Sequence, residues 1–202
     1  MEYNLTNQLD SKVIARFMDG DEDAFREIIN HYKNGLYAFL KRFLNHHDQV
    51  EDVFQEAFLQ LYNSRSKFDP TKNLRPWLFT IAANKAKDAL RKQRRTAAIP
   101  IGSIATSDEM SFGDALDILA SRDKMPLDEL AQDETAMMVR QIISEMPENL
   151  REILILSYFN QFSYKQMAQM LSIPIGTIKS RLHTAVGRFA KEWKITVGSS
   201  KK

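Results

Sequence analysis

Two small clusters of side chains in this 202-residue chain have types and spacings that could do chemistry. Asp52 and Glu56 are carboxylates one helical turn apart, and paired carboxylates can serve acid–base catalysis. His46 and His47 are adjacent and could ligate a metal ion. Neither cluster is completed, because the sequence near the carboxylates supplies no nucleophile or second acid, and no third ligand lies at helical or hairpin spacing from the histidines. We therefore expect no catalytic residue, no metal site and no cofactor.

Residues 163–188 have the pattern of a DNA-binding helix-turn-helix. Ser163 and Gln166 have the spacing of a capping box, and Pro174 breaks the first helix and begins the second. The inward face of the first helix is predicted to carry Tyr164, Met167, Ala168 and Leu171. The outer face of the second helix is polar and basic, as a recognition helix should be: Thr177, Lys179, Ser180, Arg181, His183 and Arg188. The alternative is an ordinary helical hairpin with a solvated basic face.

A helix that Asp48 is predicted to cap has two ordered faces over residues 48–62. One face is a wide apolar stripe that can pack into a core. The other repeats at i, i+3, i+4 and i+7 and carries two carboxylates, an amide and a leucine: Asp52, Gln55, Glu56 and Leu59. Periodicity alone leaves two interpretations open, a solvated helix face or a surface for a partner helix.

Residues 64–95 are strongly basic, with ten Lys or Arg against two Asp. The loop at 64–72 contains Arg65 and Lys67, and Asn73 can cap the helix that follows. One face of this helix is polar, with Asn84, Lys87, Asp88, Arg91 and Arg95. Cations and an amide in a row can contact phosphates, and the amide and the acid can read base edges. The alternative is a solvated face, but the basic loop beside the helix favours nucleic acid.

Periodicity and charge divide the chain into two helical parts. Residues 10–62 have helical patterns, with a break or bend expected at Gly35. Residues 96–132 lose the periodicity, and residues 96–135 contain nine acidic against two basic side chains. We predict an all-α fold of two small helical domains, at 1–95 and 133–194, joined by a flexible acidic linker at 96–132 and followed by a tail at 195–202.

The composition places the chain among soluble proteins of a reducing compartment. Its net charge is only +2, so nucleic-acid binding would depend on local patches. The absence of cysteine rules out disulfides and thiolate metal sites. The N-terminus lacks the basic start and apolar centre of a signal peptide, and no run approaches membrane-spanning length. We expect a cytoplasmic protein with no direct membrane insertion.

Three motifs follow one another along the chain. The first is EDVFQEAF at 51–58, and the second is RPWLFTIA at 75–82, followed by Asn84 and by DALRK at 88–92. The third is PENLRE at 147–152, which leads into GTIKSRL at 176–182. In this order and at this separation, the chain resembles the extracytoplasmic-function group of bacterial sigma factors, the two-domain promoter-recognition subunits of RNA polymerase.

The resemblance implies a role for each surface found above. The stripe from Asp52 to Leu59 matches the surface that docks on the clamp coiled coil of the polymerase's largest subunit. The basic loop and the face from Asn84 to Arg95 match the part that recognises and helps open the minus-ten element, where a base is flipped into a protein pocket. The helix-turn-helix matches the reader of the minus-thirty-five element. The implied partners are core RNA polymerase, through its clamp and flap, promoter DNA and an anti-sigma factor.

The leading hypothesis is therefore a sigma factor that is not itself an enzyme. The alternative is a stand-alone helix-turn-helix regulator that binds duplex DNA without polymerase. The acidic stripe at 52–59 discriminates between the two, because a stand-alone regulator has no need for it. A nuclease or another enzyme acting on nucleic acid would need a metal cluster or a nucleophile, which the sequence does not supply.

Overall fold

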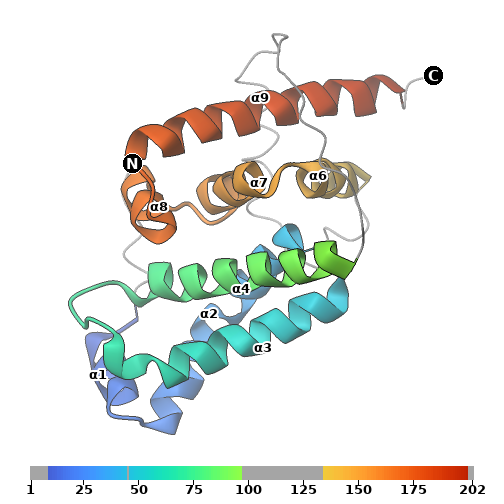
Figure 1. The fold of residues 1–202 in the computed structure, drawn as a ribbon. Coiled ribbons are helices and arrows are strands. Elements are labelled where there is room, and N and C mark those ends of the chain that lie inside the picture. The colour runs from blue at the N-terminus through green and yellow to red at the C-terminus, as the bar shows by residue number, and fades with distance from the viewer. Residues whose placement is uncertain (1–8, 45, 97–133, 200–202) are drawn as a thin grey trace.

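The computed structural model describes residues 9–44, 46–96 and 134–199, which form helices and turns without a β-strand (Figure 1). The N-terminal helices are α1 (Ser11–Met18), α2 (Glu22–Phe43), α3 (His47–Asn63), the 3₁₀ turn η2 (Arg65–Lys67) and α4 (Leu74–Thr96). The C-terminal helices are α6 (Glu134–Glu145), α7 (Glu148–Leu154), the π-helical turn η4 (Ile155–Phe159), α8 (Tyr164–Leu171) and α9 (Ile175–Ser199). The all-α prediction is confirmed, and residues 97–132 of the predicted linker lie outside the described residues.

Several helix starts carry the predicted caps. The Asp21 carboxylate accepts hydrogen bonds from two backbone N–H groups of the first turn of α2. Asn73 accepts one from the backbone of Arg75 at 2.9 Å. Ser163 and Gln166 form the complete capping box of α8. Each cap satisfies backbone donors that lack an intrahelical partner, which is why these short polar residues set the helix boundaries.

Two predictions about helix boundaries are wrong, and the last helix is longer than the predicted domain. α2 continues through Gly35 without a break, because one glycine costs a helix only about 1 kcal/mol and the buried Tyr32 and Leu36 hold the same face in the core. α3 begins before Asp48, which lies in the first turn, where its charge faces the positive end of the helix. α9 continues to Ser199, past the predicted end of the domain at residue 194.

Each part of the chain has apolar side chains at its centre. Phe17, Phe39 and Phe43 are fully buried among α1 to α4. In the C-terminal part, the four consecutive residues from Ile153 to Leu156 have no exposed surface. A helix that is apolar all round must be covered on every side, so the predicted central helix is confirmed by α7 and the turn that follows it.

The end of the α7 segment is wound as a π turn. The Asn160 N–H donates to the carbonyl of Ile155, five residues earlier, at 3.1 Å. Gln161 then takes a left-handed conformation with φ 53° and ends the helix. This turn fixes the direction in which the chain enters α8.

The two helical parts lie against each other in one continuous core. α4 packs against α8, and α2 packs against α6 and η4. The Phe79 ring of α4 meets the Phe162 ring edge-on, with centroids 5.3 Å apart. In Figure 1, α4 accordingly lies between α3 on one side and α7 and α8 on the other. The predicted two-part chain therefore has a packed seam between its parts, which the sequence did not indicate.

Candidate functional site

The polar face of α3 is open to solvent, as its periodicity predicted. Asp52, Gln55 and Glu56 are exposed, and Leu59 is 60% exposed. The opposite stripe of α3 is buried, so the leucine is the one apolar side chain of a charged face. This face offers both electrostatic and apolar contacts to a partner helix.

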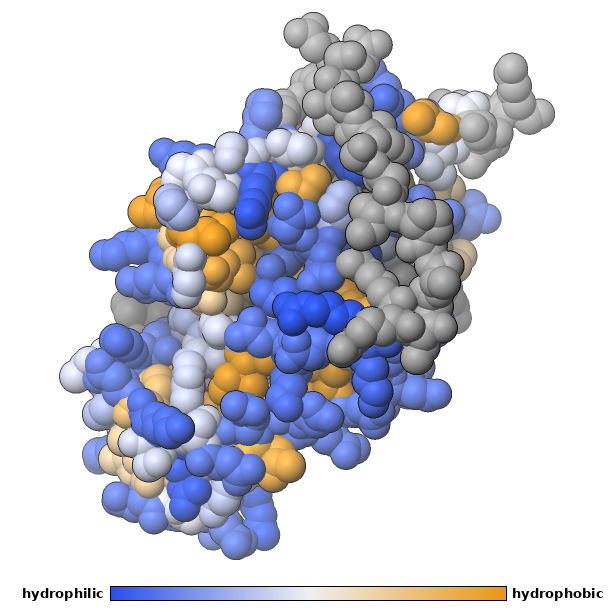
Figure 2. All heavy atoms as spheres, in the orientation of Figure 1, coloured by the Kyte–Doolittle hydropathy of each residue, from blue (hydrophilic) through white to orange (hydrophobic). Residues whose placement is uncertain are grey.

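A shallow groove of about 590 Å³ separates this face from α4. Carboxylates and amines line it together, with Asp52 and Glu56 from α3 and Lys85, Asp88 and Lys92 from α4. Lys85 Nζ lies 3.0 Å from a carboxylate oxygen of Glu56 and ties the two helices together. Figure 2 shows that the surface over α3 and α4 is largely hydrophilic, with separate hydrophobic spots.

The predicted nucleic-acid face of α4 is only partly open. Asn84, Asp88 and Arg91 are exposed, and Arg91 pairs with Asp88 at 3.0 Å on the same helix. The side chain of Arg95 lies outside the described side chains. Lys87 differs from the others, because it turns towards the C-terminal part and keeps 20% of its side chain exposed. All five predicted residues thus lie on α4, and of the four whose side chains are described, three are exposed and Lys87 is partly covered.

The two predicted cations of the basic loop have different surroundings. Lys67 is exposed at the end of η2. Arg65 lies over the Tyr62 ring, 4.3 Å from its centroid, and donates to the Tyr62 carbonyl at 3.0 Å. Its guanidinium also lies against Gly20, which has φ 91°. Arg65 therefore holds η2 to the end of α1, a packing role that its position in a polar loop did not reveal.

The α8–α9 pair has the predicted helix-turn-helix form. Ser172 ends α8 in a left-handed conformation with φ 53°, and α9 starts just after Pro174. Ile178 and Leu182 are buried, as expected for the inner stripe. On the outer face, three residues are exposed and three are half-buried: Lys179, Ser180 and His183 in the first group, and Thr177, Arg181 and Arg188 in the second.

The predicted inward face of α8 needs one correction. Tyr164 is 43% exposed, whereas Met167 and Met170 are buried. Tyr164 is the first residue of α8, and its side chain projects beyond the turn that packs on α9. The buried stripe of α8 is therefore carried by its methionines.

Two charged residues that the sequence singled out only as part of a motif are buried at the seam. Arg151 and Glu152 of α7 are each 5% exposed. Arg151 donates to the backbone carbonyls of Met146, at 3.0 Å, and of Ser144 in its own part of the chain. It also donates across the seam to the carbonyl of Phe43, the last residue of α2, at 2.8 Å. One arginine thus satisfies carbonyls at the ends of two helices.

Glu152 faces cations from both predicted DNA-binding helices. Its carboxylate lies 3.0 Å from Lys87 Nζ of α4. Burial raises the pKa of Glu152, and the positive charges of Lys87 and of Arg181 on α9 act against that rise. The apolar residues around Arg151 and Glu152 were the signal in the sequence for this buried pairing, because a charged side chain inside a helix that is apolar on all sides needs a partner.

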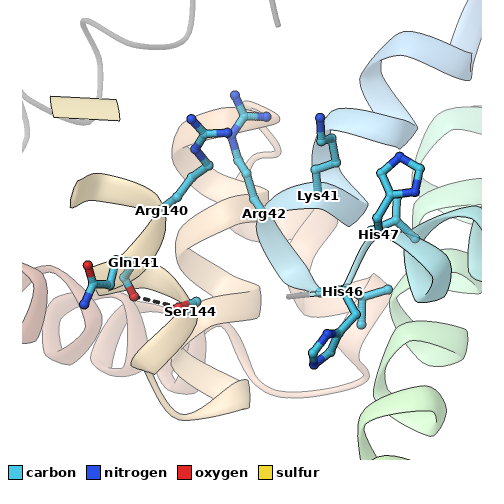
Figure 3. Close-up of a pocket in the computed structure, with 9 residues that line it drawn as sticks. Lys41, Arg42, His46, His47, Arg140, Gln141 and Ser144 are labelled. Atoms are coloured by element: carbon cyan, nitrogen blue, oxygen red, sulfur yellow. Dashed lines mark hydrogen bonds between the residues drawn. The ribbon is translucent and has the colours of Figure 1, made fainter. Parts of the chain in front are cut away.

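A basic pocket of about 350 Å³ runs along another stretch of the seam. Figure 3 shows Arg42 of α2 and Arg140 of α6 extending to the same side of this pocket, with Lys41 beside them, while His46 points away. Among the residues that the structure describes, no group of three or more His, Asp or Glu side chains could hold a metal ion. In the same residues, no helix is both long and apolar enough to cross a lipid bilayer.

Two protein families match separate parts of the chain. Sigma-70 region 2 matches residues 28–96, and Sigma-70 region 4 matches residues 136–188. The first range holds α3 and α4, and the second holds the helix-turn-helix. The segment between the two ranges contains most of the predicted linker.

Relatives and solved structures cover most of the chain. The RNA polymerase sigma-H factor of Pseudomonas aeruginosa is 32% identical over 184 residues, which are 90% of this chain and 92% of the relative. The ECF RNA polymerase sigma-E factor of Escherichia coli is 30% identical over 92% of this chain and 93% of its own. The structure of the sigma factor RpoE in complex with the anti-sigma factor NepR, from Bartonella quintana, has a TM-score of 0.62 at 26% identity and covers 85% of this chain and 97% of that one. The structure of CnrH in complex with the cytosolic domain of CnrY has a TM-score of 0.67 at 18% identity, covers 92% and 97%, and bears on the fold alone.

Proposed function

Because the chain belongs to the extracytoplasmic-function group of RNA polymerase sigma factors, which direct the polymerase to promoters, we propose that three of its surfaces divide this task. A sigma factor is a specificity subunit, so the chain is not itself an enzyme. The family also excludes the stand-alone regulator. The domain boundaries proposed are 1–95 for polymerase and minus-ten contacts and 133–194 for minus-thirty-five contacts, with helix α9 reaching beyond the second boundary.

The exposed face of α3 is the proposed contact with the clamp of core polymerase. The observation that carries this assignment is Leu59, which is 60% exposed at the end of the stripe that holds the exposed Asp52 and Glu56. Water leaves such a leucine when a partner covers it, while Asp52 and Glu56 orient a basic partner helix. Gln55 completes the contact as a hydrogen-bonding group.

The two proposed DNA contacts lie on α4 with its basic loop and on α9. On α4, Asn84, Asp88 and Arg91 present the polar face for the minus-ten element, with Lys67, Lys87 and Arg95 as proposed phosphate contacts. On α9, the basic outer face from Thr177 to Arg188 would enter the major groove at the minus-thirty-five element. An anti-sigma factor is a further proposed partner, supported by the complex of the RpoE neighbour with NepR. The proposed location of the protein is the cytoplasm, where the polymerase is.

Run-off transcription tests the assignment of the α3 face. Core polymerase with the wild-type chain should give new start sites on a genomic promoter library, and core polymerase alone should not. The double variant Asp52→Lys and Glu56→Lys should lose these products and should no longer co-purify with core polymerase, at unchanged helical content. A charge reversal at Asp23, an exposed residue of α2 outside the three surfaces, should retain both properties. Co-purification of the double variant at the wild-type level would refute the clamp contact.

A further inference from the structure

The basic pocket between the end of α2 and α6 belongs to none of the surfaces assigned above. Its volume of about 350 Å³ lies at the small end of the range for ligand sites. Of the described residues that line it, five are Lys, Arg or His and none is Asp or Glu: the five are Lys41, Arg42, His46, His47 and Arg140. A cavity with this lining is suited to an anion.

Two guanidinium groups from different helices extend to the same side of the pocket. Figure 3 shows this for Arg42 of α2 and Arg140 of α6. Arg42 donates to the Ala38 carbonyl at 3.2 Å and lies 4.5 Å from the Phe159 ring centroid. Arg140 donates to the Ala136 carbonyl at 3.3 Å. These contacts orient two like charges, which repel each other less when an anion lies between them.

The start of α3 adds backbone donors to the same pocket. His46 and His47 line it, and the His46 side chain caps none of the N–H groups in the first turn of α3. The positive end of the helix dipole favours an anion at this place. Two acids follow in the helix, and neither lines the pocket: Asp48 is exposed, and Glu51 accepts a hydrogen bond from Tyr37 at 2.9 Å.

The buried Arg151 fixes the walls of the pocket relative to each other. It donates to the Phe43 carbonyl at the end of α2, at 2.8 Å, and to the carbonyl of Ser144 in α6. Both walls are therefore tied to one guanidinium. The spacing of Arg42 and Arg140 is set before a ligand arrives, and such preorganisation lowers the cost of binding.

We propose that this pocket binds a small anion with two linked phosphate groups, a diphosphate. A guanidinium presents its donors as a fork that matches two phosphate oxygens. One fork is enough for a single phosphate, so two forks from different helices favour a diphosphate. Inorganic pyrophosphate and a nucleoside diphosphate share this chemistry. The inference is independent of the proposed polymerase and DNA surfaces, because none of their residues lines the pocket.

Calorimetric titration of the full chain with pyrophosphate, in phosphate-free buffer at physiological ionic strength, tests the site. We expect saturable binding of one anion per chain. Arg42→Gln and Arg140→Gln should each weaken binding by at least about tenfold, because each removes a charged fork. Arg42→Lys keeps the charge without the fork and should lose part of the affinity. The matched control is Arg26→Gln, which removes an exposed arginine of α2 outside the pocket and should bind as the wild type does.

Circular dichroism verifies that the variants keep their helical content. If either arginine variant unfolds, Lys41→Gln, at an exposed position of the pocket, takes its place and should also weaken binding. Wild-type affinity in the folded double variant Arg42→Gln and Arg140→Gln, or in Lys41→Gln where it stands in, would overturn the proposal.

Competing anions identify the ligand class. Binding of ADP tighter than that of pyrophosphate would identify a nucleoside diphosphate, and the reverse order would identify inorganic pyrophosphate, and both results support the site. Sulfate or single phosphate that binds as tightly as pyrophosphate would show only a general attraction of anions and would overturn the proposal. A single-stranded oligonucleotide that displaces pyrophosphate at lower concentration than ADP does would also overturn it, because the pocket would then belong to a nucleic-acid path.

Discussion

Replacement of Arg151 by alanine should strongly destabilise the fold. Its guanidinium donates to three backbone carbonyls and is almost completely buried. A hydrogen bond from a charged donor contributes about 1.5–3 kcal/mol, and breaking a buried charged network costs about 3–5 kcal/mol after water and side chains adjust. We expect Arg151→Ala to lower the free energy of unfolding by about 3–5 kcal/mol, a large share of the stability of a small protein.

Urea unfolding, followed by circular dichroism and tryptophan fluorescence, measures this loss. The chain has two tryptophans, Trp77 in α4 and Trp193 in α9, so each part of the chain has its own probe. Arg151→Met keeps much of the side-chain volume but leaves the carbonyls unpaired, so it should lose nearly as much stability as Arg151→Ala. Arg151→Lys should recover part of it.

The matched control is Arg26→Ala, which removes an exposed arginine with ion pairs on the surface of α2. Its free energy of unfolding should stay within about 0.5 kcal/mol of the wild type. If the free energy of unfolding of Arg151→Ala is also within about 1 kcal/mol of the wild-type value, the three carbonyls do not depend on Arg151. The reasoning about the seam would then be refuted as well.

Two further predictions concern DNA and pH. Lys179→Ala and Arg181→Ala should each weaken binding of the minus-thirty-five element, by about 1–3 kcal/mol if the lost contact is bidentate to a base. A gel-shift titration measures this affinity, and an unchanged value in both variants would contradict the assignment of α9. Because burial raises the pKa of Glu152 above its ordinary 4.5, the folded chain favours the protonated acid, and this contribution is lost as pH rises through the raised pKa. The stability of the wild type relative to Glu152→Gln should therefore increase as pH falls from neutral towards 4.5, and a difference independent of pH in urea titrations would rule this out.

The sequence predicted those features that depend on neighbours along the chain. The capping box of Ser163, the cap at Asn73 and the exposed stripe that ends at Leu59 each follow from a spacing of a few residues, which a helix converts directly into geometry. The errors at Gly35 and Asp48 arose where a local preference was outweighed by core packing or by one turn of helix register.

The seam could not be predicted in the same way. Lys87 and Glu152 are 65 positions apart, and no periodicity connects residues on opposite sides of a linker. The apolar run after residue 148 did indicate a central helix, but it could not show which surface would cover it. Arg75 and Arg151 belong to motifs of the family resemblance, yet their common role, the satisfaction of carbonyls across the seam, requires the packed structure.

The number of residues in the π turn at the end of α7 sets the orientation of α8 and α9, the proposed DNA-binding helices, relative to α4. A π turn contains more residues than an α-helix of the same rise, and each helical residue turns the chain by about 100°. Deletion of one residue, such as Ser157, would leave a more regular helix but would rotate everything that follows it. Asn160 would no longer present its carbonyl to Arg75, and α9 would point elsewhere relative to α4. We therefore expect this segment to tolerate substitutions but not insertions or deletions.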